Sequence, residues 1–132
     1  MKLRIRGDSI RLRLSQSEVT QVAEGNLIQE TTRFMGGAQF FYIFEPTENV
    51  QTIKATMTEN RMTVQVPLAA AKKWALSNTV EMKFEQAIPN EATEKLFILI
   101  EKDFQCLKVR ANETEDESDL FINPNVDKGS CG

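Results

Sequence analysis

The chain has 132 residues, of which 41% are hydrophobic and 27% charged, with a formal net charge of −3. This length and composition predict one globular domain and exclude a wholly disordered chain. No apolar run approaches the roughly 18 residues of a membrane span, and basic residues interrupt the start of the chain, where a secretory signal needs an apolar run. Two cysteines are too few for a disulfide framework. We therefore expect a cytoplasmic protein.

Residues 1–14 alternate apolar and basic side chains in two short runs on either side of Gly7, Asp8 and Ser9. Successive side chains on a strand point to opposite faces, so each run places Leu or Ile on one face and basic residues on the other. We expect the apolar face to enter the core. The other face then presents a stripe of guanidinium groups, which belong to Arg4, Arg6, Arg11 and Arg13.

A short helix over residues 16–24 follows. Ser15 and Glu18 have the spacing of a capping box, Leu14 and Val19 that of a hydrophobic staple, and Gly25 is placed for a left-handed C-cap.

Two hairpins come next. Residues 27–34 and 39–45 flank Gly36-Gly37, a dipeptide suited to a tight turn. Residues 51–57 and 62–66 flank a turn around Glu59-Asn60, and a two-residue turn there pairs Met57 with Met62.

A second helix extends from Pro67 to about Leu76, and strands follow near residues 80–85 and 96–100. No internal repeat and no second domain are evident in the sequence. We therefore predict an α+β fold: a mainly antiparallel, strongly curved or barrel-like sheet of about seven or eight strands, with two short helices.

Residues 1–110 are expected to form the globular domain, and residues 111–132 an acidic tail that is partly packed or disordered. The tail carries six acidic residues against Lys128, and one hypothesis is that it folds back over the arginine stripe. Metal binding has weak candidates in Cys106, Cys131, Asp116 and Asp119, and this set is incomplete without further ligands.

The chain contains no histidine, which excludes Ser-His-Asp and Cys-His catalysis and histidine metal sites. It also lacks a Walker A loop and a dinucleotide-binding glycine fingerprint. We therefore expect no cofactor, assign no catalytic residue, and favour a non-enzymatic protein.

Three segments resemble a family of short, uncharacterised bacterial proteins, a domain of unknown function: residues 2–14, residues 74–80 and residues 96–107. The stretch 115–125, with Glu115 to Phe121 and Asn123-Pro124-Asn125, adds to this resemblance. It spans nearly the whole chain and implies a small free-standing protein, with no activity attached.

A second, local resemblance covers residues 7–26, where Gly-Asp-Ser, an alternating basic strand and a capped helix follow one another. This segment is similar to the swapped-hairpin DNA-binding domains of bacterial antitoxins and transition-state regulators. The resemblance implies a dimeric β-barrel whose basic residues, here Arg4, Arg6, Arg11 and Arg13, contact DNA. Those domains have about fifty residues, whereas this chain continues as one larger unit.

The stripe predicts a binding or interaction module for an anionic small molecule, an acidic peptide or the protein's own tail. Its simplest alternative is a solvated face whose arginines pair with acids such as Glu81 and Glu85. Two further alternatives are a swapped-hairpin DNA-binding regulator and a metal-dependent phosphoryl-processing enzyme. The net charge argues against general nucleic-acid binding, and a homodimer is compatible with the sequence.

Overall fold

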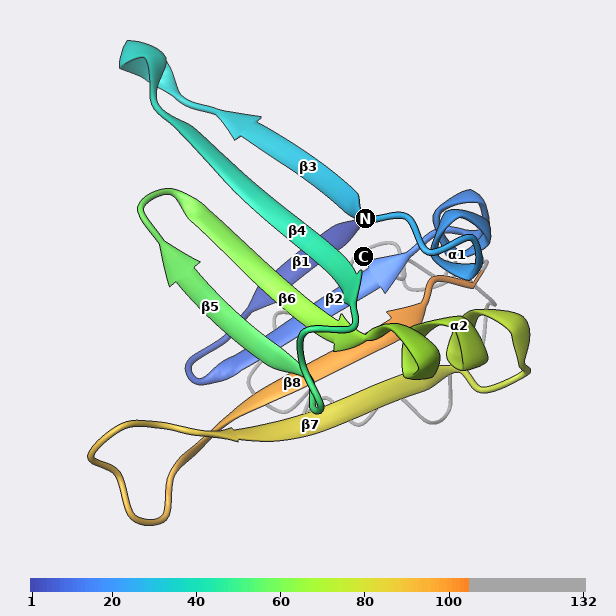
Figure 1. Cartoon of the computed structure of the whole chain (residues 1–132). Helices are drawn as coiled ribbons and strands as arrows, with labels where there is room; N and C mark the ends of the chain where they lie inside the picture. Colours follow the sequence, from blue (N-terminus) through green and yellow to red (C-terminus); the bar gives the residue numbers. More distant parts are fainter. Residues whose placement is uncertain (105–132) are drawn as a thin grey trace, which may run out of the picture.

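The computed structural model describes residues 1–104, which form two four-stranded sheets and two α-helices (Figure 1). Sheet A contains, in spatial order, β1 (Lys2–Ile5), β2 (Ser9–Leu14), β8 (Lys95–Lys102) and β7 (Glu81–Ala87). Sheet B contains β3 (Ile28–Arg33), β4 (Gln39–Thr47), β6 (Arg61–Pro67) and β5 (Lys54–Thr58). The α+β class is confirmed, while the predicted boundary at residue 110 lies outside the described residues.

Strand pairing is mainly antiparallel, as predicted, but the strands form two mixed sheets rather than one barrel-like sheet. Each sheet joins two antiparallel hairpins through a parallel central pair, β2 with β8 and β4 with β6. Hairpins are local and can be predicted from turns, whereas each parallel pair joins strands from distant parts of the chain. The sheets do not close into a barrel.

Side chains link the edges of the two sheets where a closed barrel would have a backbone ladder. Between β7 and β5, the Gln86 amide accepts from the Ala55 N–H at 2.7 Å and donates to the Ala55 carbonyl at 2.9 Å. At the opposite seam, the Met1 ammonium donates to Glu30 of the edge strand β3 at 2.9 Å, and the Tyr42 hydroxyl of the central strand β4 donates to the Met1 carbonyl at 3.3 Å. These two hydrogen bonds satisfy the backbone N–H and carbonyl of Ala55 on the edge strand β5, although β5 and β7 do not pair as strands.

Both predicted helices form, and they contact each other at one end of the molecule (Figure 1). Helix α1 (Gln16–Ala23) begins with the predicted capping box, in which the Ser15 side chain accepts from the Glu18 N–H and the Glu18 carboxylate accepts from the Ser15 N–H. Gly25 has the left-handed φ of 86° expected after the helix. Helix α2 (Leu68–Leu76) directly follows β6.

Both predicted hairpins are also confirmed. Gly36 and Gly37 have φ angles of 83° and 85° at the tip of the β3–β4 hairpin, within the short 3₁₀ helix η1 (Met35–Gly37). In the β5–β6 hairpin Met57 lies opposite Met62, as predicted.

The fold contains an internal repeat. Residues 2–47 form two hairpins separated by a helix (β1, β2, α1, β3, β4), and residues 54–102 repeat this order (β5, β6, α2, β7, β8). The first hairpin of each unit pairs with the second hairpin of the other unit. The repeat is not evident in the sequence, because equivalent positions share only the class of side chain. For example, Leu12 lies between Leu3 and Ile100, and its equivalent Val64 lies between Ala55 and Phe44.

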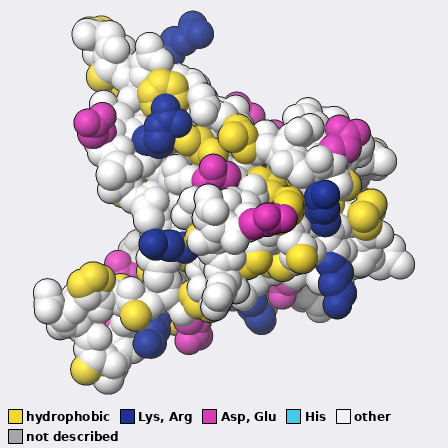
Figure 2. Space-filling view, in the orientation of Figure 1, with side chains coloured by type: hydrophobic (Ala, Val, Ile, Leu, Met, Phe, Trp, Pro, Cys, Tyr) yellow, Lys and Arg dark blue, Asp and Glu magenta, His cyan; other side chains and the backbone are white. Residues whose placement is uncertain are grey.

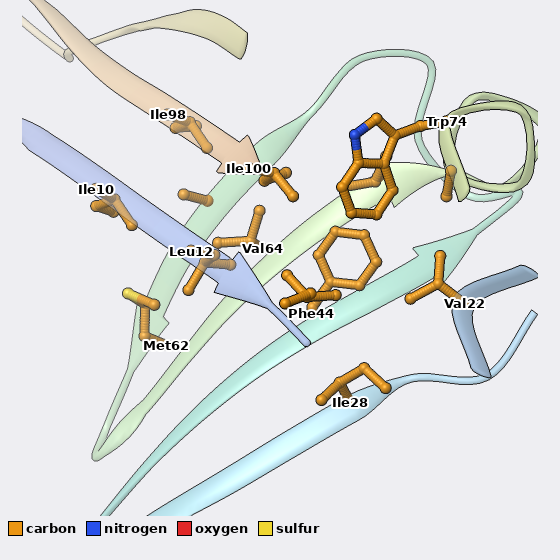
Figure 3. Packing of buried hydrophobic residues seen from close by; sticks show 14 residues of the cluster. Ile10, Leu12, Val22, Ile28, Phe44, Met62, Val64, Trp74, Ile98 and Ile100 are labelled. Carbon is orange, nitrogen blue, oxygen red and sulfur yellow. The ribbon is translucent and has the colours of Figure 1, made fainter. Parts of the chain in front are cut away.

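The inner faces of the two sheets and one side of each helix enclose the core (Figure 3). Leu12, Phe44, Val64 and Ile100 are fully buried at its centre. The Trp74 ring from α2 packs 6.4 Å from the Phe44 ring, and its indole N–H donates to the Val80 carbonyl at 3.1 Å. With one side of each sheet committed to this core, the alternate residues of β1 and β2 form the outer face of sheet A.

Candidate anion-binding face

The outer face of sheet A carries four cations on its first two strands. Lys2 lies directly opposite Arg13, and Arg4 directly opposite Arg11, across the antiparallel β1–β2 pair. We call these four residues the basic face. Like charges placed directly opposite each other destabilise a sheet, so this arrangement has a folding cost unless anions offset it.

These cations surround a hollow with a volume of about 230 Å³, lined by Lys2, Leu3, Arg4, Arg11 and Arg13. Three of the four arginines predicted from the sequence therefore meet at one site. Arg6 lies beyond the end of β1, where its backbone N–H donates to the Ser9 carbonyl at 3.0 Å in the turn, and it does not line the hollow. Lys2, which was not among the predicted site residues, also lines the hollow.

Glu101, on β8, holds two of the arginines in place. The Nε atoms of Arg11 and Arg13 both donate to its Oε1, at 2.7 and 2.5 Å. The Glu101 side chain is 12% exposed, against 31% for Arg11 and 18% for Arg13. Because both bonds use Nε, they leave the terminal amino groups of the two guanidinium groups out of the contact with Glu101.

Burial alone would raise the pKa of Glu101, but the hydrogen bonds and charges of Arg11 and Arg13 outweigh it, and the pKa is lowered from 4.5. Glu101 is therefore ionised at neutral pH and offsets part of the positive charge. Asp103 offsets another part, since its carboxylate lies 3.1 Å from the Lys2 ammonium.

The partner of these arginines is Glu101, whereas Glu81 and Glu85 were the acids expected from the sequence. Strand β8 lies between β2 and β7, so it is Glu101 that registers with Arg13, while Glu81 lies one strand further away, opposite Glu101. One signal was present in the sequence: an acidic residue directly follows the apolar run 96–100 of a central strand. A carboxylate on a central strand is largely buried and therefore needs a cation or hydrogen-bond donor as its partner.

Sheet B has an equivalent outer face, because the two units of the chain repeat. Matching strand registers place Lys54 where Lys2 lies and Glu45 where Glu101 lies. The positions of the three arginines are occupied there by neutral residues: Thr56 for Arg4, Thr63 for Arg11 and Gln65 for Arg13. The Gln65 amide donates to Glu45 at 3.0 Å, in the manner of Arg13 with Glu101.

This comparison separates what the fold needs from what sheet A adds. Both faces retain a lysine on the edge strand and a glutamate on the central strand, whereas arginines at these three positions occur in sheet A alone. Sheet B has an arginine at another position of its outer face, Arg61, which lies over the Phe41 ring. Sheet B forms with threonine and glutamine at those positions. The arginines are therefore not a requirement of this strand arrangement.

Elsewhere the charges are mixed. On the face of the molecule turned to the viewer in Figure 2, acidic and basic side chains are interspersed without a large patch of one sign.

In the described part of the chain no group of three Cys, Asp or Glu residues is placed to hold a metal ion. The weak metal candidates Cys106, Cys131, Asp116 and Asp119 lie outside the described residues. Within residues 1–104 no helix is long and apolar enough to cross a membrane.

Fold and site together define a two-sheet α+β protein with one basic sheet face, a class to which no single activity is attached. The chain belongs to the family of unknown function DUF7009, whose model matches residues 1–125. The predicted membership of a family of unknown function is thus confirmed. No curated protein and no solved structure matches the chain. The local resemblance to swapped-hairpin regulators stays a prediction.

Proposed function

We propose that the protein is a non-enzymatic binding module whose basic face takes the phosphate or carboxylate groups of an anionic partner. The observation that carries this proposal is the difference between two equivalent faces. Both have the lysine and the glutamate, and only sheet A adds Arg4, Arg11 and Arg13.

The geometry supports an anion rather than a neutral ligand. Guanidinium groups bind phosphate and carboxylate through two parallel N–H donors, and an arginine anchored through Nε keeps its terminal amino groups for such contacts. Glu101 fixes two guanidinium groups in advance, so less side-chain entropy is lost when an anion binds. A bound anion would also relieve the repulsion between the opposed cations of β1 and β2.

The test gives sheet A the residues that sheet B has at the three arginine positions. We would measure binding of tripolyphosphate by isothermal titration calorimetry at low salt, for the wild type and for Arg4→Thr, Arg11→Thr and Arg13→Gln combined. The matched control is Arg33→Gln, Arg61→Gln and Lys54→Gln combined, which removes the same number of cations from the other sheet. Binding abolished by the first variant and kept by the control supports the proposal; equal losses, or no binding by the wild type, contradict it.

A second candidate, a DNA-binding regulator of swapped-hairpin type, is favoured by one observation. The hairpin β1–β2 precedes α1, and it pairs with β7–β8 of the other unit rather than with the hairpin that follows it. Within this one chain, each unit thus pairs its first hairpin with the second hairpin of the other unit. The swapped-hairpin domains make the corresponding exchange between the two subunits of a dimer. Duplex DNA serves as the test ligand: four phosphate contacts predict a slope of roughly −3 to −4 for log affinity against log salt concentration. A slope near zero contradicts this function.

A metal-dependent phosphoryl-processing enzyme has no comparable support. It needs carboxylates that converge opposite the arginines. Within residues 1–104 the carboxylate that meets them is Glu101, and two guanidinium groups already engage its Oε1.

A further inference from the structure

The described chain ends beside the basic face. After β8, the Asp103 N–H donates to the Leu14 carbonyl at 2.9 Å, and its carboxylate pairs with Lys2 at 3.1 Å. Lys2 lies opposite Arg13, so the chain reaches Phe104 at the Lys2–Arg13 end of the face. Residues 105–132 start from that point.

The sequence beyond this point has the complementary charge and a matching period. Residues 113–119 read Glu-Thr-Glu-Asp-Glu-Ser-Asp, which we call the acidic segment. Its acids at 113, 115, 117 and 119 alternate with period two, and in an extended chain alternate residues lie about 7 Å apart on one side. The cations of β1 and β2 have the same period, at residues 2 and 4 and at residues 11 and 13.

The connection is long enough. Residues 105–112 can span up to about 27 Å when extended. Strand β2 has six residues, which corresponds to about 20 Å. The acidic segment can therefore reach any part of the basic face from Phe104.

We propose that the acidic segment is the resident occupant of the basic face, and that an external anion binds by displacing it. The contact itself follows from the exit point, the reach and the two charge patterns. The competition rests on the proposed function. Tethering holds the segment at a local concentration of millimolar order, so a segment with a dissociation constant near 0.1 mM would weaken an external anion about tenfold.

One experiment measures the contact directly. A carbodiimide joins lysine ammonium groups to carboxylates in direct contact, and mass spectrometry identifies the joined peptides in the full chain. The pair Lys2–Asp103 serves as the internal positive control. We expect a second product between Lys2 and residues 113–119 that disappears in 0.5 M NaCl; its absence while the Lys2–Asp103 product forms overturns the contact.

A second experiment measures the competition. The test variant carries Glu113→Gln, Glu115→Gln, Glu117→Gln and Asp119→Asn in the full chain. A control variant changes the net charge equally at exposed sites of the body, through Glu24→Gln, Glu48→Gln, Glu91→Gln and Glu94→Gln. We expect the test variant to bind tripolyphosphate about tenfold more tightly than the wild type, and the control to change less than twofold.

The outcomes separate this inference from the proposed function. Equal gains in both variants mean a general charge effect, and no gain in either means no competition; both overturn the inference while anion binding by the wild type keeps the proposed function. If no variant binds tripolyphosphate but Lys2 is joined to the acidic segment, the contact stands and the proposed function fails.

Discussion

Replacing Glu101 with glutamine should lower stability and raise anion affinity at the same time. Glutamine has nearly the same shape and keeps an oxygen that can accept from the Nε atoms of Arg11 and Arg13, which now donate to Glu101 at 2.7 and 2.5 Å. The change thus removes one negative charge from the centre of the basic face with little change in packing.

The size of the effect follows from the two hydrogen bonds. A hydrogen bond to a charged group contributes about 1.5–3 kcal/mol; in the variant the arginine donors keep their charge while the acceptor becomes neutral, so we expect each bond to lose about 1 kcal/mol. The arginines are partly exposed, at 31% and 18%, which weakens the charged bonds. We expect a net loss of about 1–2 kcal/mol at pH 7, or roughly 4–8 °C in Tm for a domain of this size.

The pH dependence identifies the cause. The folded-state pKa of Glu101 is lowered from 4.5, so its ionised form stabilises the fold above that value, and the contribution is lost as the pH falls through the lower folded-state pKa. The stability gap between wild type and Glu101→Gln should be constant near neutral pH and should shrink below pH 4.5. Urea unfolding at pH 7, 5, 4 and 3 measures this gap.

Anion affinity completes the prediction. Without the carboxylate, the terminal amino groups of Arg11 and Arg13 meet less competition, so tripolyphosphate should bind more tightly to the glutamine variant and recover part of its lost stability. A gap that stays constant down to pH 3, or an affinity that falls in the variant, would refute the assigned role of Glu101.

Three further changes test the fold around the site by urea unfolding. Gln86→Leu leaves the Ala55 N–H and carbonyl at the sheet seam without their partner and should cost about 2 kcal/mol, so a change below 0.5 kcal/mol would show that the seam is not held there. Phe44→Ala empties the centre of the core and should cost about 3–5 kcal/mol; a smaller loss means that the two sheets close onto the space. Ser15→Ala removes the N-cap of α1 and should cost about 1 kcal/mol, whereas Ser15→Asp should keep most of the stability, and equal losses would contradict the capping role.

Local features of the fold could be predicted from the sequence, because their causes lie within a few residues. The capping box at Ser15, the turn at Gly36-Gly37 and the register of Met57 with Met62 depend on adjacent residues, and all three are confirmed. Their success reflects short loops and strict alternation.

Long-range pairing could not be predicted, because period-two alternation shows which side of a strand is buried and not which strand lies beside it. The partner of Arg11 and Arg13 lies 90 and 88 residues away, on a strand that pairs in parallel. For the same reason Glu81 and Glu85 were the wrong acids. Three of the four arginines of the stripe line one hollow, and Arg6 lies beyond the end of β1; anion binding by the stripe stays a prediction.

The equivalence of the two sheet faces also allows the binding site to be built a second time. The variant Thr56→Arg, Thr63→Arg and Gln65→Arg would place three arginines around Glu45 and Lys54 on sheet B, where the strand registers match those of sheet A. A control variant adds the same charge at exposed positions away from this face, through Gln21→Arg, Asn49→Arg and Gln51→Arg.

The most direct test of the account is the stoichiometry of tripolyphosphate binding to these two variants, measured by calorimetry. If the arginines on a lysine–glutamate strand pair make the anion site, the wild type and the control should bind one equivalent and the sheet B variant two. A sheet B variant that folds and still binds one equivalent, or a control that also binds two, would contradict the account.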